Sequence, residues 1–174
     1  MTLLHLYRTP ALSAFQTEAL LDTVKQQVTP GIRGIETEFC FNVAATEPLT
    51  ADETRLLRWL LAETFEPEKF SDKSFLNLPA PPFVKGGAGG DSRHSPPASR
   101  LTPHLVFEVG PRMNFTTAWS TNAVSICRAC GLRKITRIER SRRYLLLLKD
   151  DKSLTREQEN AFLSLVHDRM TECP

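Results

Sequence analysis

The chain has 174 residues, of which 41% are hydrophobic and 24% charged, with 22 Lys and Arg against 20 Asp and Glu. This is the composition of an ordinary globular protein, and it excludes collagen-like, wholly disordered and supercharged classes. The net charge of +2 is too small by itself to indicate a nucleic-acid or membrane partner.

The strands are predicted from alternating hydrophobicity. The first spans residues 4–10 and ends at a proline, and residues 105–111 repeat that pattern. Between them, residues 35–43 alternate aromatic or aliphatic side chains with polar ones. Period-two alternation is typical of a strand with one buried and one solvated face. Glu36 and Glu38 then fall together on the solvated face.

The helices are predicted from capping signals at their N-termini. Three capping boxes, in which a hydroxyl and an amide or carboxyl group satisfy each other's backbone N–H groups, precede apolar stripes at helical spacing. They pair Ser13 with Gln16, Thr50 with Glu53, and Thr155 with Gln158. A further helix is expected from about Ser120 to Cys130. It should end at Gly131, because glycine is the usual residue beyond a helix C-terminus.

Three short matches indicate a duplicated unit. Residues 4–10 recur at 105–111, residues 32–36 at 135–139, and residues 49–53 at 154–158, at offsets of 101, 103 and 105. The order β-α-β-α therefore occurs twice. It predicts an α+β fold of ferredoxin-like type, with a shared antiparallel sheet and helices on one face.

The whole chain, 1–174, is expected to form a single domain. Its first half is residues 1–64 and its second half residues 104–174. Between them, residues 65–103 are rich in Pro, Gly and Ser, and we expect a mobile insertion because such a segment buries little apolar surface.

No motif supplies a catalytic, cofactor-binding or metal-binding residue. The glycine run at 86–90 lacks the strand, helix and Lys-Ser/Thr of a phosphate-binding loop. Cys127 and Cys130 form a single CxxC without further metal ligands. The four cysteines do not make a disulfide framework, and the first residues lack a secretory pattern. We expect a cytoplasmic protein without a membrane partner.

The charge is unevenly distributed. Between Arg112 and Lys149 there are nine basic residues and one acidic residue, Glu139, whereas the remainder has 13 basic and 19 acidic residues. Such a stretch is compatible with a solvated sheet edge, or with contact to an acidic partner or phosphate. The aromatic strand motif of RNA-binding modules is missing, so a nucleic-acid partner is not favoured.

The segment Gly110–Asn122 is the most unusual stretch, because it is polar and aromatic and joins a strand to a helix. Loops on rigid elements often carry recognition residues. Alternatively, its aromatic residues extend the core and Ser120 caps the helix, and the sequence leaves both interpretations open. The candidate residues for docking to another domain are Arg112, Asn114, Phe115, Thr116, Trp119, Ser120, Asn122, Arg137 and Arg140.

Residues 108–132 closely resemble the N-terminal region of the phosphoribosylformylglycinamidine synthase family, also called formylglycinamide ribonucleotide amidotransferase, in its long single-chain form. Four further segments match the same region in order: residues 10–15, 34–38, 137–144 and 165–172. The resemblance covers nearly the whole chain outside the expected insertion.

The resemblance implies a PurS-like, non-catalytic assembly domain of a glutamine amidotransferase and ligase in purine biosynthesis. Such a domain packs on the synthetase domain and supports ammonia transfer. Its partners would be the synthetase and glutaminase domains of the same polypeptide, with ATP and magnesium bound there and no cofactor in this chain. Two other classes stay open: a free-standing basic module that binds RNA or another polyanion, and a stand-alone enzyme with an unrecognised site.

Overall fold

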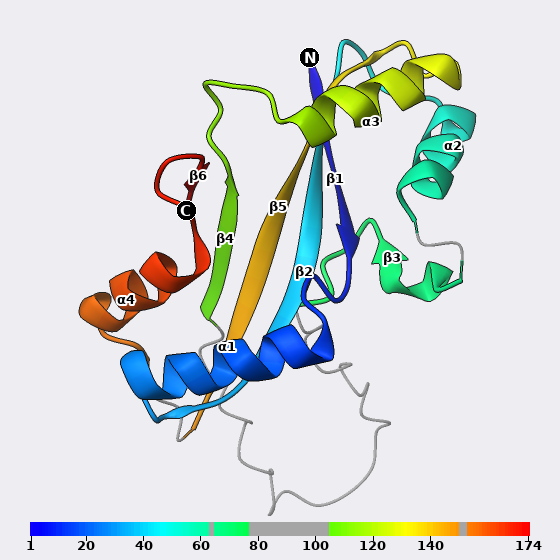
Figure 1. Cartoon of the computed structure of the whole chain (residues 1–174). Helices are drawn as coiled ribbons and strands as arrows, with labels where there is room; N and C mark the ends of the chain where they lie inside the picture. Colours follow the sequence, from blue (N-terminus) through cyan, green and yellow to red (C-terminus); the bar gives the residue numbers. More distant parts are fainter. Residues whose placement is uncertain (63–64, 77–104, 150–152) are drawn as a thin grey trace, which may run out of the picture.

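The computed structural model describes residues 1–62, 65–76, 105–149 and 153–174. Its elements follow one another in two similar series (Figure 1). The first series is β1 (Thr2–Arg8), α1 (Ala14–Gln27), β2 (Ile32–Ala45), α2 (Ala51–Leu61), the 3-10 turn Pro67–Lys69 and β3 (Phe70–Ser71). The second is β4 (Leu105–Pro111), α3 (Ala118–Ala129), β5 (Ile135–Leu148), α4 (Arg156–Val166) and β6 (Glu172–Cys173).

One antiparallel sheet contains all the strands of the described ranges, in the order β3-β1-β2-β5-β4-β6. The two long central strands, β2 and β5, pair along nearly their whole length and join the two halves of the duplication. Each half then adds its first strand and its short last strand toward one edge. The predicted duplication is therefore visible in the strand order itself.

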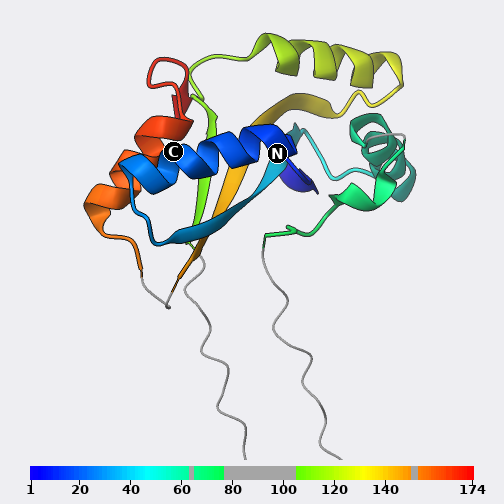
Figure 2. The ribbon, with the colours of Figure 1, turned by 60° about the horizontal axis from the view of Figure 1, so that its bottom comes forward.

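The four helices of the described residues lie on one face of this sheet, which we call the helical face (Figure 2). Helices α1 and α3 cross the central strands at opposite ends, and α4 and α2 lie beside them (Figure 1). The other side of the sheet, the open face, carries no helix among the described residues. These features confirm the expected α+β, ferredoxin-like arrangement.

Two hydrophobic clusters lie under the helices, and each combines both halves of the chain. Helices α1 and α4 cover the cluster of Val24, Ile32, Ile35, Val109, Tyr144, Leu146, Leu154, Phe162 and Val166. Helices α2 and α3 cover the cluster of Leu6, Phe41, Val43, Leu57, Phe70, Val124, Cys127, Leu132, Ile135 and Ile138. Since burial of apolar area drives folding, neither half has a complete core alone.

All three predicted capping boxes are present, at Ser13, Thr50 and Thr155. The fourth helix differs from the prediction, because α3 begins at Ala118 and its cap is Thr117, whose hydroxyl accepts a bond from the Ser120 amide at 3.0 Å. Ser120 therefore lies inside the helix.

The expected insertion begins with structured residues. Phe70 pairs in β3 and is buried with Leu76, at 6% and 3% exposure. The Gly/Pro/Ser-rich remainder of the expected insertion, 77–103, lies outside the described residues. Within the described part of the chain, no helix is long and apolar enough to cross a bilayer.

Candidate functional site

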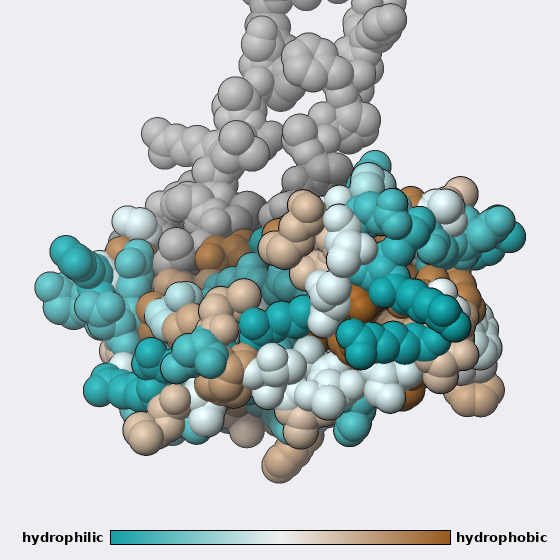
Figure 3. Space-filling model, turned by 90° about the horizontal axis from the view of Figure 1, so that it is seen from above, coloured by the Kyte–Doolittle hydropathy of each residue, from teal (hydrophilic) through white to brown (hydrophobic). Residues whose placement is uncertain are grey.

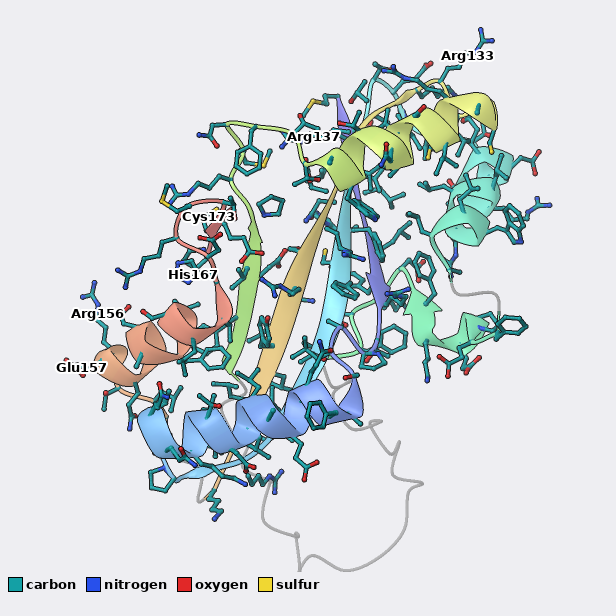
Figure 4. The ribbon with its side chains drawn as sticks, in the orientation of Figure 1. Arg133, Arg137, Arg156, Glu157, His167 and Cys173 are labelled. Carbon is teal, nitrogen blue, oxygen red and sulfur yellow. The ribbon has the colours of Figure 1, made fainter. Side chains whose placement is uncertain are left out.

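The loop between β4 and α3, residues 112–117, is held in place by Arg137 of β5. The Arg137 guanidinium donates hydrogen bonds to the carbonyl oxygens of Met113 at 3.4 Å and Phe115 at 2.5 Å. Figure 4 shows Arg137 beside the start of α3, whereas Arg133 points away from the molecule beyond the other end of that helix. Arg137 thus holds the conformation of this loop, which we call the β4–α3 loop.

Glu139, only 4% exposed, completes this attachment. Its carboxylate accepts bonds from the Thr117 backbone amide at 3.3 Å and hydroxyl at 2.8 Å, and it pairs with Arg137 at 3.1 Å. A buried carboxylate is tolerated when its oxygens are paired and hydrogen-bonded in this way. The helix start and the strand are therefore joined by one polar network.

The nine residues predicted for docking do not lie on one surface. Arg112, Asn114, Thr116, Asn122 and Arg140 are exposed. Phe115 is 37% exposed, and Trp119 packs against the core. Ser120 is fully buried, and its hydroxyl has no hydrogen-bond partner among the described residues. In this conformation Ser120 is inaccessible to a partner, and Arg137 is largely occupied by the chain's own carbonyl groups.

Arg112 links the loop to the C-terminal segment. Its guanidinium donates a hydrogen bond to the carbonyl oxygen of Arg169 at 2.8 Å, and its backbone amide donates one to the carbonyl oxygen of Thr171 at 3.0 Å. Arg169 lies beyond the end of α4 at Val166.

Arg140 lies on the helical face among aromatic rings. Its guanidinium carbon is 4.3 Å from the ring centre of Phe39 and 5.2 Å from that of Trp119. The Arg8 guanidinium lies over the same Phe39 ring at 5.2 Å. Although the residue is exposed, packing of its guanidinium against the rings partly desolvates it and lowers the pKa of Arg140, and the positive charges of Arg8 and Arg142 lower it further. Two guanidinium groups, those of Arg8 and Arg140, therefore lie over one aromatic ring.

Beside Arg140 is a small pocket of about 190 Å³. Its walls are Pro111, Phe115, Thr117, Trp119, Glu139, Arg140, Thr171 and Glu172. The Glu172 carboxylate is held by the Arg142 guanidinium, with contacts of 2.6 and 2.8 Å. The pocket thus lies between the β4–α3 loop, β5 and the C-terminal strand.

The open face carries a polar cluster that the sequence analysis missed. His5 Nδ1 lies 2.8 Å from Asn42 Oδ1 and 3.8 Å from the Cys40 sulfur. The Asn42 amide donates to the Ser141 hydroxyl at 3.1 Å, and that hydroxyl donates to Glu108 at 2.5 Å. Alternation places Cys40 and Asn42 on the polar face, but their neighbours come from other strands through the sheet register.

This cluster does not have the geometry of a cysteine nucleophile. In a Cys-His-Asn arrangement the thiol and the amide contact opposite imidazole nitrogens, whereas here both approach Nδ1 of His5. Burial raises the pKa of the Cys40 thiol to about 11, and Glu108 acts in the same direction. A reactive cysteine needs a lowered pKa. The cluster therefore links neighbouring strands of the sheet through its hydrogen bonds.

Neither cysteine of the predicted CxxC belongs to a site in the described structure. Cys127 is buried and Cys130 is exposed. Burial also raises the pKa of Cys127. No group of three or more potential metal ligands occurs in the described ranges.

The open face ends in an apolar groove of about 770 Å³. Met1, Leu3 and Met113 line it and are 97%, 57% and 73% exposed. Figure 3 looks down on this end of the molecule, where brown hydrophobic patches interrupt a largely hydrophilic surface. Because Met113 also belongs to the β4–α3 loop, the groove and the loop are neighbours.

Fold and surfaces together define a duplicated ferredoxin-like domain whose described polar clusters maintain its own structure. The chain belongs to the family described as "Formylglycinamide ribonucleotide amidotransferase N-terminal", whose sequence model matches residues 38–174. Phosphoribosylformylglycinamidine synthase of Dictyostelium discoideum is 44% identical over 176 residues, covering 99% of this chain and 12% of the relative.

Two further relatives give the same result. A probable phosphoribosylformylglycinamidine synthase of Arabidopsis thaliana, described as chloroplastic/mitochondrial, is 41% identical and covers 98% of this chain and 11% of the relative. The human phosphoribosylformylglycinamidine synthase is 39% identical over 82% of this chain and 9% of the relative. The chain therefore spans about a tenth of the length of these curated relatives.

Proposed function

We propose that the chain is the non-catalytic N-terminal assembly domain of a phosphoribosylformylglycinamidine synthase in purine biosynthesis. In this role it packs on the synthetase domain of the same polypeptide and supports the transfer of ammonia from the glutaminase domain. ATP and magnesium are bound by those other domains. We place the protein in the cytoplasm, although the plant relative is described as chloroplastic/mitochondrial.

The observation that carries this proposal is the coverage of the relatives. Nearly all of this chain aligns, at 44% identity, with only 12% of the Dictyostelium synthase. The matching family is itself described as N-terminal. A domain that forms a tenth of a larger enzyme and has no catalytic geometry in its described residues is best explained by a role in assembly.

We further propose that docking uses the exposed part of the β4–α3 loop together with the apolar groove. This docking surface consists of Arg112, Asn114, Phe115, Thr116, Met1, Leu3 and Met113. Exposed large apolar side chains that lie together are typical of interaction sites. Arginine and aromatic residues beside them are enriched at interfaces. The occupant that we assign is the synthetase domain.

The alternative of a polyanion-binding module is weaker than the sequence suggested. Of the nine basic residues between Arg112 and Lys149, four form ion pairs with carboxylates of the described residues. These are Lys134, Arg137, Arg142 and Arg143. Their charge is therefore compensated within the domain, which leaves less of it for a polyanion.

The proposal is tested by adding one negative charge to the docking surface of the full-length polypeptide. Asn114→Asp should lower glutamine-dependent synthase turnover, and the melting temperature of the 174-residue chain should stay unchanged because Asn114 is exposed. The control Gln26→Glu adds the same charge at an exposed position of α1, which lies at the other end of the sheet (Figure 1), and it should leave turnover unaltered.

Supplying ammonia directly separates the two parts of the proposal. If docking supports ammonia transfer, the Asn114→Asp enzyme should recover most of its turnover with ammonium chloride. A full-length enzyme that is indifferent to Asn114→Asp and to Met113→Asp would place the interface elsewhere.

A further inference from the structure

The duplication provides an internal comparison for the pocket beside Arg140. In the duplication Pro10 matches Pro111, and Ile35 matches Ile138. Thr37, two residues after Ile35, is therefore the counterpart of Arg140, two residues after Ile138. A pocket of about 580 Å³ lies at the corresponding place in the first half, with Leu12 among its walls. The two halves therefore keep an equivalent pocket but line it differently.

Thr37 and Arg140 have different structural roles at these equivalent positions. The Thr37 hydroxyl accepts bonds from the backbone amides of Ala11 and Leu12 at 3.1 and 3.2 Å, so it holds its own loop. In the second half, Arg137 and Glu139 hold the loop instead. Arg140 makes none of the loop's hydrogen bonds among the described residues. Its charge is therefore available to the pocket.

The other charges of the pocket are already compensated. Glu139 pairs with Arg137, and Glu172 pairs with Arg142. Among the described residues no carboxylate forms an ion pair with Arg140, whose contacts are the rings of Phe39 and Trp119. A guanidinium presents several N–H donors in a planar fork that matches carboxylate and phosphate oxygens.

We propose that this pocket binds a phosphate group, free or as a phosphomonoester, through the Arg140 guanidinium. Trp119 and Phe115 form the apolar walls beside it. A phosphate carries more charge and more acceptor oxygens than a carboxylate, so the planar donor fork of Arg140 favours it. This site goes beyond the proposed docking function, and it can be tested in the 174-residue chain without it.

Trp119 provides a signal for the test. The second tryptophan, Trp59, is 73% exposed on α2 and is removed as Trp59→Phe. Titration with inorganic phosphate and with glycerol 2-phosphate, at constant ionic strength set by chloride, should change the Trp119 fluorescence saturably. Calorimetry should give the same dissociation constant. Tighter binding of the ester indicates a phosphorylated ligand, and equal binding indicates the free ion.

Arg140→Gln should weaken phosphate binding about tenfold or more, as expected for a hydrogen bond to a charged group. Arg140→Lys, which keeps the charge but loses the fork, should have an intermediate affinity. The matched control is Arg133→Gln, which removes one exposed positive charge beyond the far end of α3 and should leave the affinity within about twofold (Figure 4).

Three results would overturn the proposal. The first is the absence of saturable phosphate binding. The second is equal weakening by Arg140→Gln and Arg133→Gln, which would indicate general screening. The third is acetate binding as tightly as phosphate, which would point to an acidic protein segment as the natural occupant.

Discussion

Glu38 and Arg143 face each other across the β2–β5 pair and form an ion pair, with 2.5 Å between Oε1 and Nη1. Their side chains are 0% and 14% exposed. The same carboxylate accepts bonds from the Ser74 hydroxyl at 2.6 Å and the Phe75 amide at 2.7 Å. One carboxylate thus joins the two halves of the duplication and anchors the segment after β3.

Removing one member of this pair should be strongly destabilising. Arg143→Met leaves the Glu38 carboxylate without its guanidinium partner, and it should lower the free energy of unfolding by about 3–5 kcal/mol in urea denaturation. The double variant Glu38→Gln/Arg143→Met should be more stable than Arg143→Met alone. A loss below about 1 kcal/mol for Arg143→Met would mean that the pair behaves as a solvent-exposed one.

Arg137→Ala should destabilise the isolated chain although Arg137 was predicted as a docking residue. The variant removes two bonds to loop carbonyls and the partner of buried Glu139, so a loss of about 2–3 kcal/mol is expected. Asn114→Ala, in the exposed part of the same loop, should be silent in the same urea experiment. Wild-type stability of Arg137→Ala would show that the loop is held by other contacts.

Gly131→Ala should cost about 1–2 kcal/mol because of backbone strain alone. Gly131 follows the C-cap of α3 with a φ of +90°, and a Cβ there would meet no atom within 4 Å. Thermal and urea unfolding measure the effect. Gly31→Ala is the control, since its Cβ would make only an ordinary contact at 3.4 Å with Thr29. If both variants are equally stable, the positive φ carries no cost here.

The cap of α2 should make stability depend on pH. The pKa of Glu53 is lowered from its ordinary value of 4.5, mainly by the hydrogen bond from the Thr50 backbone amide and secondly by the hydrogen bond from Lys134. A lowered folded-state pKa stabilises the fold above the unfolded value, and this stabilisation is lost as the pH falls through the folded value. The wild type should therefore exceed Glu53→Gln in unfolding free energy at pH 7, with the difference shrinking below pH 4.5.

Lys134→Met tests the origin of this dependence. In this variant the change in unfolding free energy between pH 7 and pH 3 should be smaller than in the wild type. It should not disappear, because the hydrogen bond from the Thr50 amide to Glu53 at 2.7 Å remains. Parallel stability curves for wild type and Glu53→Gln across this range would contradict the assignment.

Local signals predicted the helices well, and their failures have physical causes. A capping box needs a carboxyl or amide group three residues after the cap, which Ser13, Thr50 and Thr155 have. Thr117 is followed at that distance by Ser120, so the start of α3 carried no such signal. Strands β3 and β6 contain two residues each, too few for a period to be detected.

The sequence alone determined the duplication, the alternation of the strands and the family resemblance, because these depend on residues close together in the chain or on repeated order. Tertiary structure alone decided which polar side chains meet. Alternation places Glu38 on the solvated face, and this expectation is wrong because the Glu38 side chain is fully buried. Its partner Arg143 is 105 residues away and is selected by the strand register. The same holds for Arg140 and Phe39, which become neighbours only when β2 and β5 pair.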